Sequence, residues 1–306
     1  MLTSIRGITA ATFSAGLLLS AAPAFASETA SPASAGEDMQ ATEALNNEAV
    51  ETEGVLADTS AIENEVSVVP MIAPAKAPVD DKSSNSIGAE SPITISGNVA
   101  FATEYRFRGV ALTDGEFAIQ GGFDVNHSSG FYVGTWGSNL DEQTVGYGST
   151  ELDIYGGWSG TLIGGLSADF GVIGYLYPDA GPGQFDYVEF YGSATFGIGP
   201  GSVTAGIAYA PEQDSLGMTD NTYIYAGASV GLPNTPITLN AQVGYTEGFL
   251  TFTTDSEAVD WMIGADLALG PVTLNASYVG VEGDPLLDPN GTFTDDAFVV
   301  SLSASF

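Results

Sequence analysis

The sequence of 306 residues predicts an all-β protein: a transmembrane, antiparallel, up-and-down β-barrel of about 12 strands, preceded by a disordered acidic N-terminal segment. Three observations predict this fold. The chain ends in an alternating strand that closes on Phe306, charged residues keep to one parity of the expected strands, and short turns alternate with long acidic connections. Together they indicate a closed sheet with an apolar outside and a wet inside, the form in which strands cross a membrane.

Residues 1–26 are expected to be a cleavable secretory signal peptide. Arg6 gives the start a weak positive charge, an apolar run surrounds Leu17–Leu19, and the small-residue stretch Ala24–Ala26 ends the segment. The run is too short and too rich in alanine for a spanning helix. No later segment reaches the roughly 18 consecutive apolar residues that a spanning helix needs. The mature chain is therefore expected to be exported and to cross a membrane with strands.

Residues 27–91 are expected to be a disordered acidic linker in the periplasm. They hold 13 carboxylates, two lysines and no aromatic residue. Such a composition buries too little apolar surface to offset the chain entropy lost on folding. A spacer or tether to the cell wall and an inert solvated tail both remain open.

The overall composition excludes several function classes. The chain has 38 acidic and 5 basic residues and a formal charge of −33, whereas nucleic-acid binding needs a basic surface. It contains no cysteine, so disulfides, thiolate metal sites and cysteine nucleophiles are excluded. Such a chain attracts cations.

Residues 92–306 are expected to form the barrel, because short alternating segments are separated there by Gly, Pro, Asn and Asp. The expected strands are 93–108, 117–127, 131–138, 150–158, 166–177, 187–196, 203–209, 223–230, 237–246, 259–269, 272–279 and 296–306. Connections after the even strands are tight, including 159–161 with 164–165, and those after most odd strands are long and acidic. Outer-membrane barrels keep short turns in the periplasm and long loops outside, so both chain ends are expected on the periplasmic side.

One parity of the expected strands is apolar and the other carries the charges. The residues expected to line the pore are Glu104, Arg106, Arg108, Asp124, Glu151, Asp153, Asp169, Glu189, Asp260 and Asp266. A soluble β-sandwich would also show alternation. It gives no reason, however, for carboxylates opposite the apolar stripes together with alternating long and short connections.

The two arginines are the only basic residues after residue 91. They are two apart on the first expected strand and so share its inward face. We expect them to lie opposite carboxylates such as Asp124 or Glu104, either as a structural clamp or as a solute-binding pair. Eight inward carboxylates against two arginines favour cations. A row of inward tyrosines is either a lining for sugars or aromatic solutes or ordinary barrel filler: Tyr155, Tyr175, Tyr177, Tyr187, Tyr191, Tyr223 and Tyr225.

Five short segments resemble the TorF family of bacterial porins: 104–116 (EYRFRGVALTDGE), 118–124 (AIQGGFD), 129–138 (SGFYVGTWGS), 151–157 (ELDIYGG) and 171–178 (GVIGYLYP). The resemblance covers about residues 95–306 and is strongest in the first half. It implies an outer-membrane pore and names no substrate. It does not extend to the acidic segment before Pro92.

The expected function is an outer-membrane porin-like channel for passive diffusion of small hydrophilic solutes, favouring cations. Its expected partners are outer-membrane lipids, the barrel-assembly machinery, for which Phe306 is the C-terminal anchor, and the solutes. A non-conducting adhesion barrel that binds a partner through its acidic loops is the alternative. A lipid hydrolase using His127 comes third, since Ser128 and Ser129 are expected to point away from it. No enzyme activity, cofactor or metal is expected. The acidic connection before the last strand has oxygen ligands but lacks the glycine position of a calcium loop.

Overall fold

The computed structural model describes residues 85–86, 91–251, 253–285 and 293–306. The expected signal peptide, residues 1–26, lies outside the described residues, and so does all but Asn85, Ser86 and Ser91 of the expected linker 27–91. Most of the described residues are in strands, and α1 (Glu142–Val145) is a single turn of helix.

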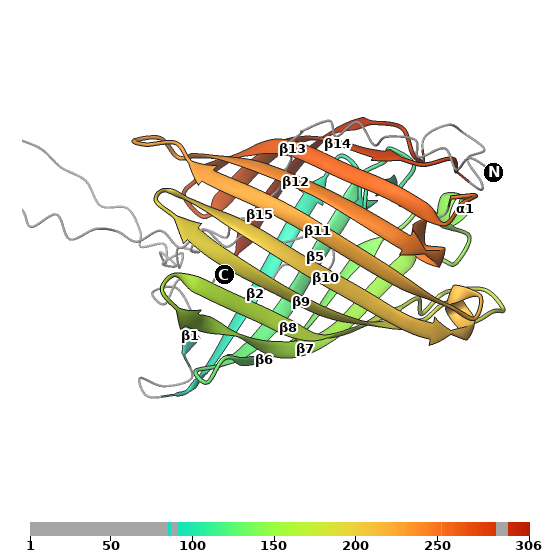
Figure 1. The fold of residues 1–306 in the computed structure, drawn as a ribbon, viewed down its shortest axis with the longest axis horizontal. Coiled ribbons are helices and arrows are strands. Elements are labelled where there is room, and N and C mark those ends of the chain that lie inside the picture. The colour runs from blue at the N-terminus through green and yellow to red at the C-terminus, as the bar shows by residue number, and fades with distance from the viewer. Residues whose placement is uncertain (1–84, 87–90, 252, 286–292) are drawn as a thin grey trace, which may run out of the picture. The chain divides into compact units, whose positions relative to one another are not determined.

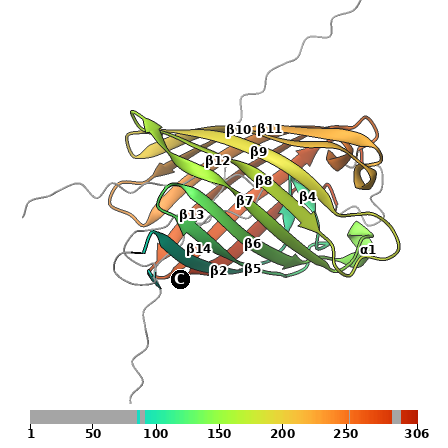
Figure 2. The same cartoon turned by 90° about the horizontal axis from the view of Figure 1, so that it is seen from below.

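Within the described residues, twelve strands close into one antiparallel barrel (Figures 1 and 2). They are β2 (Ile93–Ala102), β5 (Ala118–His127), β6 (Phe131–Asn139), β7 (Thr150–Ile163), β8 (Leu166–Leu176), β9 (Tyr187–Ile198), β10 (Gly201–Gln213), β11 (Thr219–Gly231), β12 (Ile237–Gly248), β13 (Glu257–Leu269), β14 (Val272–Glu282) and β15 (Ala297–Ser305). Each pairs with its neighbours in sequence, and β2 pairs with both β15 and β5. The predicted up-and-down barrel is confirmed.

Alternation along each strand separates the two faces of the barrel. On β7, Glu151, Asp153 and Tyr155 are buried, whereas Leu152 and Ile154 between them are exposed. The same holds around the ring, where large apolar side chains such as Phe101, Ile119 and Ile263 lie on the outside. A closed sheet with an apolar outer face satisfies every backbone group and suits a bilayer.

The short turns lie at one end of the barrel and the mostly longer connections at the other, as predicted (Figure 1). One turn is placed differently. β7 continues through residues 159–161 to Ile163, and the chain turns at Gly164 and Gly165, whose φ angles of 58° and 82° favour glycine. The long connections carry α1 (Glu142–Val145) and the 3-10 turns η1 (Asp214–Leu216) and η2 (Phe249–Thr251). No helix among the described residues has the length and apolar character of a membrane-spanning helix.

The barrel closes where β15 meets β2, the partner that the parity of the two strands predicts. Ser305 pairs with Asn98, and the backbones of Phe306 and Gly97 exchange two hydrogen bonds of 2.8 and 2.9 Å. Beyond that point β1 (Asn85–Ser86) pairs with residues 94–95 of β2. β15 pairs with residues 98–102 of β2, and these two residues of the expected linker pair with the part of the same edge that lies before them.

The first barrel strand is shorter than predicted, and this moves both arginines. β2 ends at Ala102, and the chain then turns inward into a small two-stranded sheet of β3 (Arg106–Phe107) and β4 (Val110–Ala111). We call residues 106–111 the inner hairpin. Its turn residues Arg108 and Gly109 both have positive φ, 48° and 86°, as a two-residue type I′ turn requires. Arg106 and Arg108 therefore lie on this hairpin and not on the barrel wall.

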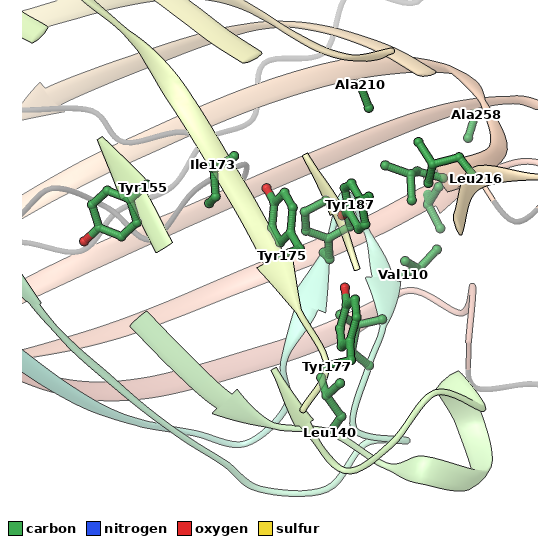
Figure 3. Close-up of a cluster of buried hydrophobic side chains, with 14 of the residues drawn as sticks. Val110, Leu140, Tyr155, Ile173, Tyr175, Tyr177, Tyr187, Ala210, Leu216 and Ala258 are labelled. Atoms are coloured by element: carbon green, nitrogen blue, oxygen red, sulfur yellow. The ribbon is translucent and has the colours of Figure 1, made fainter. Parts of the chain in front are cut away.

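The barrel interior is packed differently toward its two ends. Toward the long connections, apolar and aromatic side chains gather around the inner hairpin, with the rings of Tyr175 and Tyr187 stacked 4.5 Å apart (Figure 3). Val110 of the hairpin belongs to this cluster (Figure 3). Toward the short turns, buried inward residues are small or polar: Ser202, Thr204, Ser229, Asn240, Thr273 and Asn275.

Several inward tyrosine rings lie against glycines of the neighbouring strand. Tyr155 pairs across from Gly134, and Tyr225 pairs across from Gly206. A Cβ atom at either glycine would collide with the tyrosine ring. The glycines therefore make room for the inward tyrosines. Tyr155 and Tyr225 pack inside the barrel, as the interpretation of the tyrosine row as ordinary barrel filler expects.

Candidate functional site

The inner hairpin crosses the barrel interior from one wall toward another. On one side, a Cβ at Gly109 would lie 2.6 Å from Val281 Cβ of β14, and the Ala111 N–H donates to Phe293 O at 2.8 Å. On the other side, Arg108 reaches Glu189 on β9. β14 and β9 are five positions apart in the ring of twelve strands. The hairpin thus spans the interior and narrows it.

Arg106 holds the hairpin in shape. Its Nε donates to Glu104 Oε2 at 2.7 Å and its Nη2 to Glu104 Oε1 at 3.1 Å, which is the two-pronged geometry that matches guanidinium to carboxylate. Its Nη1 donates to the carbonyl oxygens of Gly109, at 2.8 Å, and Asp295. Arg106 therefore ties the hairpin turn to the connection before β15, and the expected pairing with Glu104 is observed.

Arg108 makes the contact across the interior. Its Nη2 lies 2.7 Å from both carboxylate oxygens of Glu189, and both side chains are almost completely buried. Its guanidinium carbon lies 4.5 Å from the ring centroid of Tyr223, within the range of a cation–π interaction. Arg108 thus lies opposite a carboxylate, as expected, but the carboxylate is Glu189 and neither of the two examples given from the sequence, because the inner hairpin carries Arg108 away from the barrel wall.

Four of the other inward carboxylates accept hydrogen bonds from tyrosine or asparagine. Tyr155 donates to Asp124 at 2.7 Å, Tyr132 to Asp169 at 2.6 Å, and Tyr223 to Asp260 at 3.0 Å. Asp266 receives the amides of Asn240 at 3.2 Å and Asn275 at 2.8 Å. These donors are neutral, so they solvate the carboxylates without supplying an opposite charge.

Glu151 and Asp153 have a poorer set of donors. Tyr105, just before the inner hairpin, donates its hydroxyl to Glu151 Oε1 at 3.0 Å. Asp153 Oδ1 has no hydrogen-bond partner among the described residues. The two residues are only 2% and 1% exposed. They are two buried carboxylates two positions apart on β7, with Tyr105 as the donor to Glu151.

The ten residues expected to line the pore all point to the inside, nine of them buried and Asp169 half-buried. Seven lie on barrel strands, and Glu104, Arg106 and Arg108 lie on or next to the inner hairpin. The described interior thus holds eight carboxylates and two guanidinium groups, a formal excess of six negative charges. Fixed charges in a narrow, low-dielectric passage create a strong local field.

Two tyrosines of the site were missed in the sequence. Tyr132 lies on the inward face of β6, between the outward residues Phe131 and Val133. Its inward position could therefore have been predicted from the alternation of that strand. Tyr105 lies in the segment that was expected to continue the first strand. Its contact with Glu151 depends on the inward turn of the chain, which alternation alone does not reveal.

His127 and Ser129 are closer than expected. His127 Nδ1 lies 2.7 Å from Ser129 Oγ and accepts the Ser129 N–H at 3.1 Å, so the expectation that the two side chains point apart is wrong. Ser128 makes no such contact in the described structure. The pair lies exposed on the short turn after β5, and no carboxylate of the described residues hydrogen-bonds His127, so the third member of a Ser–His–acid triad is missing there.

Within the described residues, no three His, Asp or Glu side chains come together as ligands of a metal ion. The expected absence of a calcium loop before the last strand cannot be compared with the fold at 286–292, which lies outside the described residues.

Comparisons with solved structures give several β-barrels at low sequence identity. A KdgM porin matches with a TM-score of 0.47 and 8% identity, over 69% of this chain and 99% of that chain. A NanC porin matches with a TM-score of 0.45 and 9% identity, over 69% and 98%. OmpF of Salmonella typhi, in a complex with daunomycin, matches with a TM-score of 0.36 and 11% identity, over 70% and 97%.

Among curated proteins none matches the chain. A family of bacterial proteins matches residues 86–306, a range that includes every barrel strand, and its description is "Bacterial protein of unknown function (Gcw_chp)". The chain belongs to the Gcw_chp family.

Proposed function

We propose that the protein is a porin-like channel of the bacterial outer membrane that lets small hydrophilic solutes diffuse passively and favours cations. One observation carries the proposal: the interior of a closed, apolar-coated barrel holds eight carboxylates, and its only two guanidinium groups among the described residues are engaged by Glu104 and Glu189. A negative interior attracts cations and repels anions.

The inner hairpin makes the proposed passage narrow. It crosses from β14 to Arg108 and Glu189, and the aromatic side chains beside it are buried. The passage is therefore proposed to admit solutes of the size of hydrated ions, with selection by charge. The resemblance to the TorF family of porins supports the same function, and membership of that family is part of the proposal.

The chain topology supports a sidedness for the barrel. The short turns, the start of β2 and the end of β15 lie at the same end of the barrel, and outer-membrane barrels keep short turns in the periplasm. The signal peptide 1–26, the periplasmic linker 27–91 and the barrel domain 92–306 complete this proposal.

Phe306 is proposed as the anchor that the barrel-assembly machinery reads. Its ring is about half exposed on the outside and lies against Gly97 of the closing seam. Deleting Phe306 should lower the amount of barrel inserted in the outer membrane and leave the ion selectivity of the inserted fraction unchanged. Phe298→Ala, which removes another exposed aromatic side chain of β15, is the control. Equal insertion of the deletion and the control contradicts the anchor.

Reconstitution of the purified barrel into planar bilayers tests the channel. Stepwise current increments on insertion support it, and a folded, inserted barrel without current supports the adhesion barrel instead. The contact between His127 and Ser129 makes the hydrolase testable as well. Ester or phospholipid hydrolysis by the wild type that is lost in both His127→Ala and Ser129→Ala would establish it, and equal rates in all three proteins would remove it.

A further inference from the structure

Glu151 and Asp153 differ from the other inward carboxylates in what surrounds them. Glu104 and Glu189 have an arginine and Asp266 has two amide donors. Asp260 accepts from Tyr223 on Oδ1 and, like Asp153, has one oxygen without a partner among the described residues, but it has no second carboxylate two positions away on its strand. Asp153 Oδ1 has no partner among the described residues although the side chain is 1% exposed. Leaving a buried carboxylate oxygen without a donor is costly, so this oxygen indicates a ligand that the protein itself does not supply.

We propose that Glu151 and Asp153 form a binding site for a hard cation inside the barrel, the position within the acidic lining at which a passing cation is held. The proposal rests on the proposed channel and names the residues that hold its cations. Hard cations such as K⁺ and Ca²⁺ share a preference for oxygen ligands. A cation between the two carboxylates would supply the missing partner of Asp153 Oδ1 and balance the two charges.

The geometry of β7 places the two carboxylates together. The residues are two apart on one strand, so both point inward with Cβ atoms about 7 Å apart. This separation lets two flexible carboxylates converge on one ion. Trp136 of β6 lies directly opposite Asp153, and Tyr105 donates to Glu151. Since Tyr105 directly precedes the inner hairpin, the pair lies where the hairpin leaves the wall, at the narrowed part of the interior.

Two protein carboxylates are few ligands for a cation, and such a site suits an ion that passes through the channel better than one that stays bound. No third acidic side chain joins the pair as a metal ligand within the described residues. Ca²⁺ takes 6–8 oxygen ligands, so most positions around the ion would be filled by water. A site in a conducting path must bind well enough to attract the ion and weakly enough to release it. Two carboxylates with exchangeable water meet both needs.

Terbium luminescence tests the site without requiring conduction. Tb³⁺ replaces Ca²⁺ at oxygen sites and is excited by nearby aromatic rings, here Trp136 and Tyr105, whose ring centroids lie 5.6 Å apart. The refolded full-length barrel in detergent should show saturable Tb³⁺ emission that Ca²⁺ displaces. In the Glu151→Gln/Asp153→Asn double variant, we expect the apparent affinity to fall by at least about tenfold, because both charged ligands are lost.

Asp266→Asn is the matched control, since it neutralises an inward carboxylate that already has two amide donors. It should bind Tb³⁺ within about twofold of the wild type, because the ion-binding oxygens are untouched. Both variants keep side-chain size, and resistance of the barrel to detergent unfolding at room temperature verifies the fold. Unchanged Tb³⁺ binding in the double variant, or equal loss in the control, overturns the site.

Calcium block of the K⁺ current separates this inference from the channel itself. Ca²⁺ should reduce the wild-type current by occupying the pair, and the double variant should need at least about tenfold more Ca²⁺ for the same block. A wild type that binds Tb³⁺ at the pair but carries no current supports the site and contradicts the channel. A current whose Ca²⁺ block is identical in the double variant contradicts the site and leaves the channel standing.

Discussion

Arg108 joins the inner hairpin to Glu189 on β9, with Nη2 2.7 Å from both carboxylate oxygens. Because both side chains are buried, removing one partner leaves an uncompensated charge in the interior. Arg108→Ala or Glu189→Ala should therefore lower the free energy of unfolding by about 3–5 kcal/mol. Urea unfolding of the barrel in detergent micelles measures this change.

The double variant Arg108→Met/Glu189→Gln separates the ion pair from simple loss of packing. It removes both charges together, so we expect it to be destabilised less than either alanine variant. If the double variant is as unstable as the sum of both single variants, the two charges do not stabilise each other.

Gly109 should be required for the position of the inner hairpin. It has a φ of 86°, and a Cβ there would lie 2.6 Å from Val281 Cβ and 2.9 Å from the Gly280 carbonyl oxygen. Gly109→Ala should displace the hairpin from β14 and increase the single-channel conductance. Gly115→Ala is the control, because its φ of 74° is similar but no atom lies within 4 Å. Equal conductance of both variants and the wild type would show that the hairpin does not narrow the path.

Gly206 should be required for the packing of Tyr225. The two residues are paired between β10 and β11, and a Cβ at Gly206 would collide with the ring. Gly206→Ala should lower the free energy of unfolding by about 1–3 kcal/mol through overpacking. At Gly192 of β9 a Cβ would have its nearest neighbouring atom 3.8 Å away, so Gly192→Ala should be close to neutral. Similar urea midpoints for the two variants would contradict the packing argument.

Asp179 should make the contact between two long connections, those before β7 and after β8, depend on pH. Its carboxylate accepts the Ser149 hydroxyl at 2.6 Å and the N–H groups of Ser149 and Thr150 at 3.0 and 3.2 Å. The hydroxyl first, and then the Ser149 N–H, hold the pKa of Asp179 below its ordinary value. A carboxylate with a lowered pKa stabilises the fold above its unfolded value, about 3.9, and this contribution is lost as the pH falls through the folded value.

Hydrogen exchange checks this dependence. The Ser149 and Thr150 amides should exchange faster in Asp179→Asn than in the wild type at neutral pH, because the charged acceptor is gone. The difference should shrink only as the pH falls through the folded-state pKa of Asp179, which lies below the ordinary value of about 3.9. A difference that is constant from pH 7 down to strongly acidic pH would exclude the carboxylate charge as its cause.

The barrel itself was predictable because one physical rule repeats in every strand. Outward apolar and inward polar residues alternate with a period of two, and this pattern repeats in each of the twelve strands. The segment 103–117 escapes this rule. Residues 104–108 alternate like a wall strand, yet the turn at Arg108 and Gly109 bends them inward. Arg-Gly is not among the turn pairs that announce a hairpin, such as Asn-Gly.

The charged members of the candidate site were predictable, whereas their contacts were not and two of its tyrosines were missed. Inward parity placed Asp124, Glu151 and Glu189 correctly, because parity depends only on the strand. Their partners depend on which strands face one another across the interior, and Arg108 with Glu189 are 81 positions apart in the chain. Contacts across a closed ring follow from its curvature and from the inner hairpin, neither of which leaves a local signal in the sequence.

The reversal potential of the wild-type barrel in a planar bilayer tests the central claim most directly. With KCl more concentrated on one side, an interior holding eight carboxylates and two paired arginines should give a potential of the sign set by K⁺. Raising the salt concentration on both sides at a fixed ratio should weaken this preference, because mobile ions screen the fixed charges. A potential of the sign set by Cl⁻ would contradict the account.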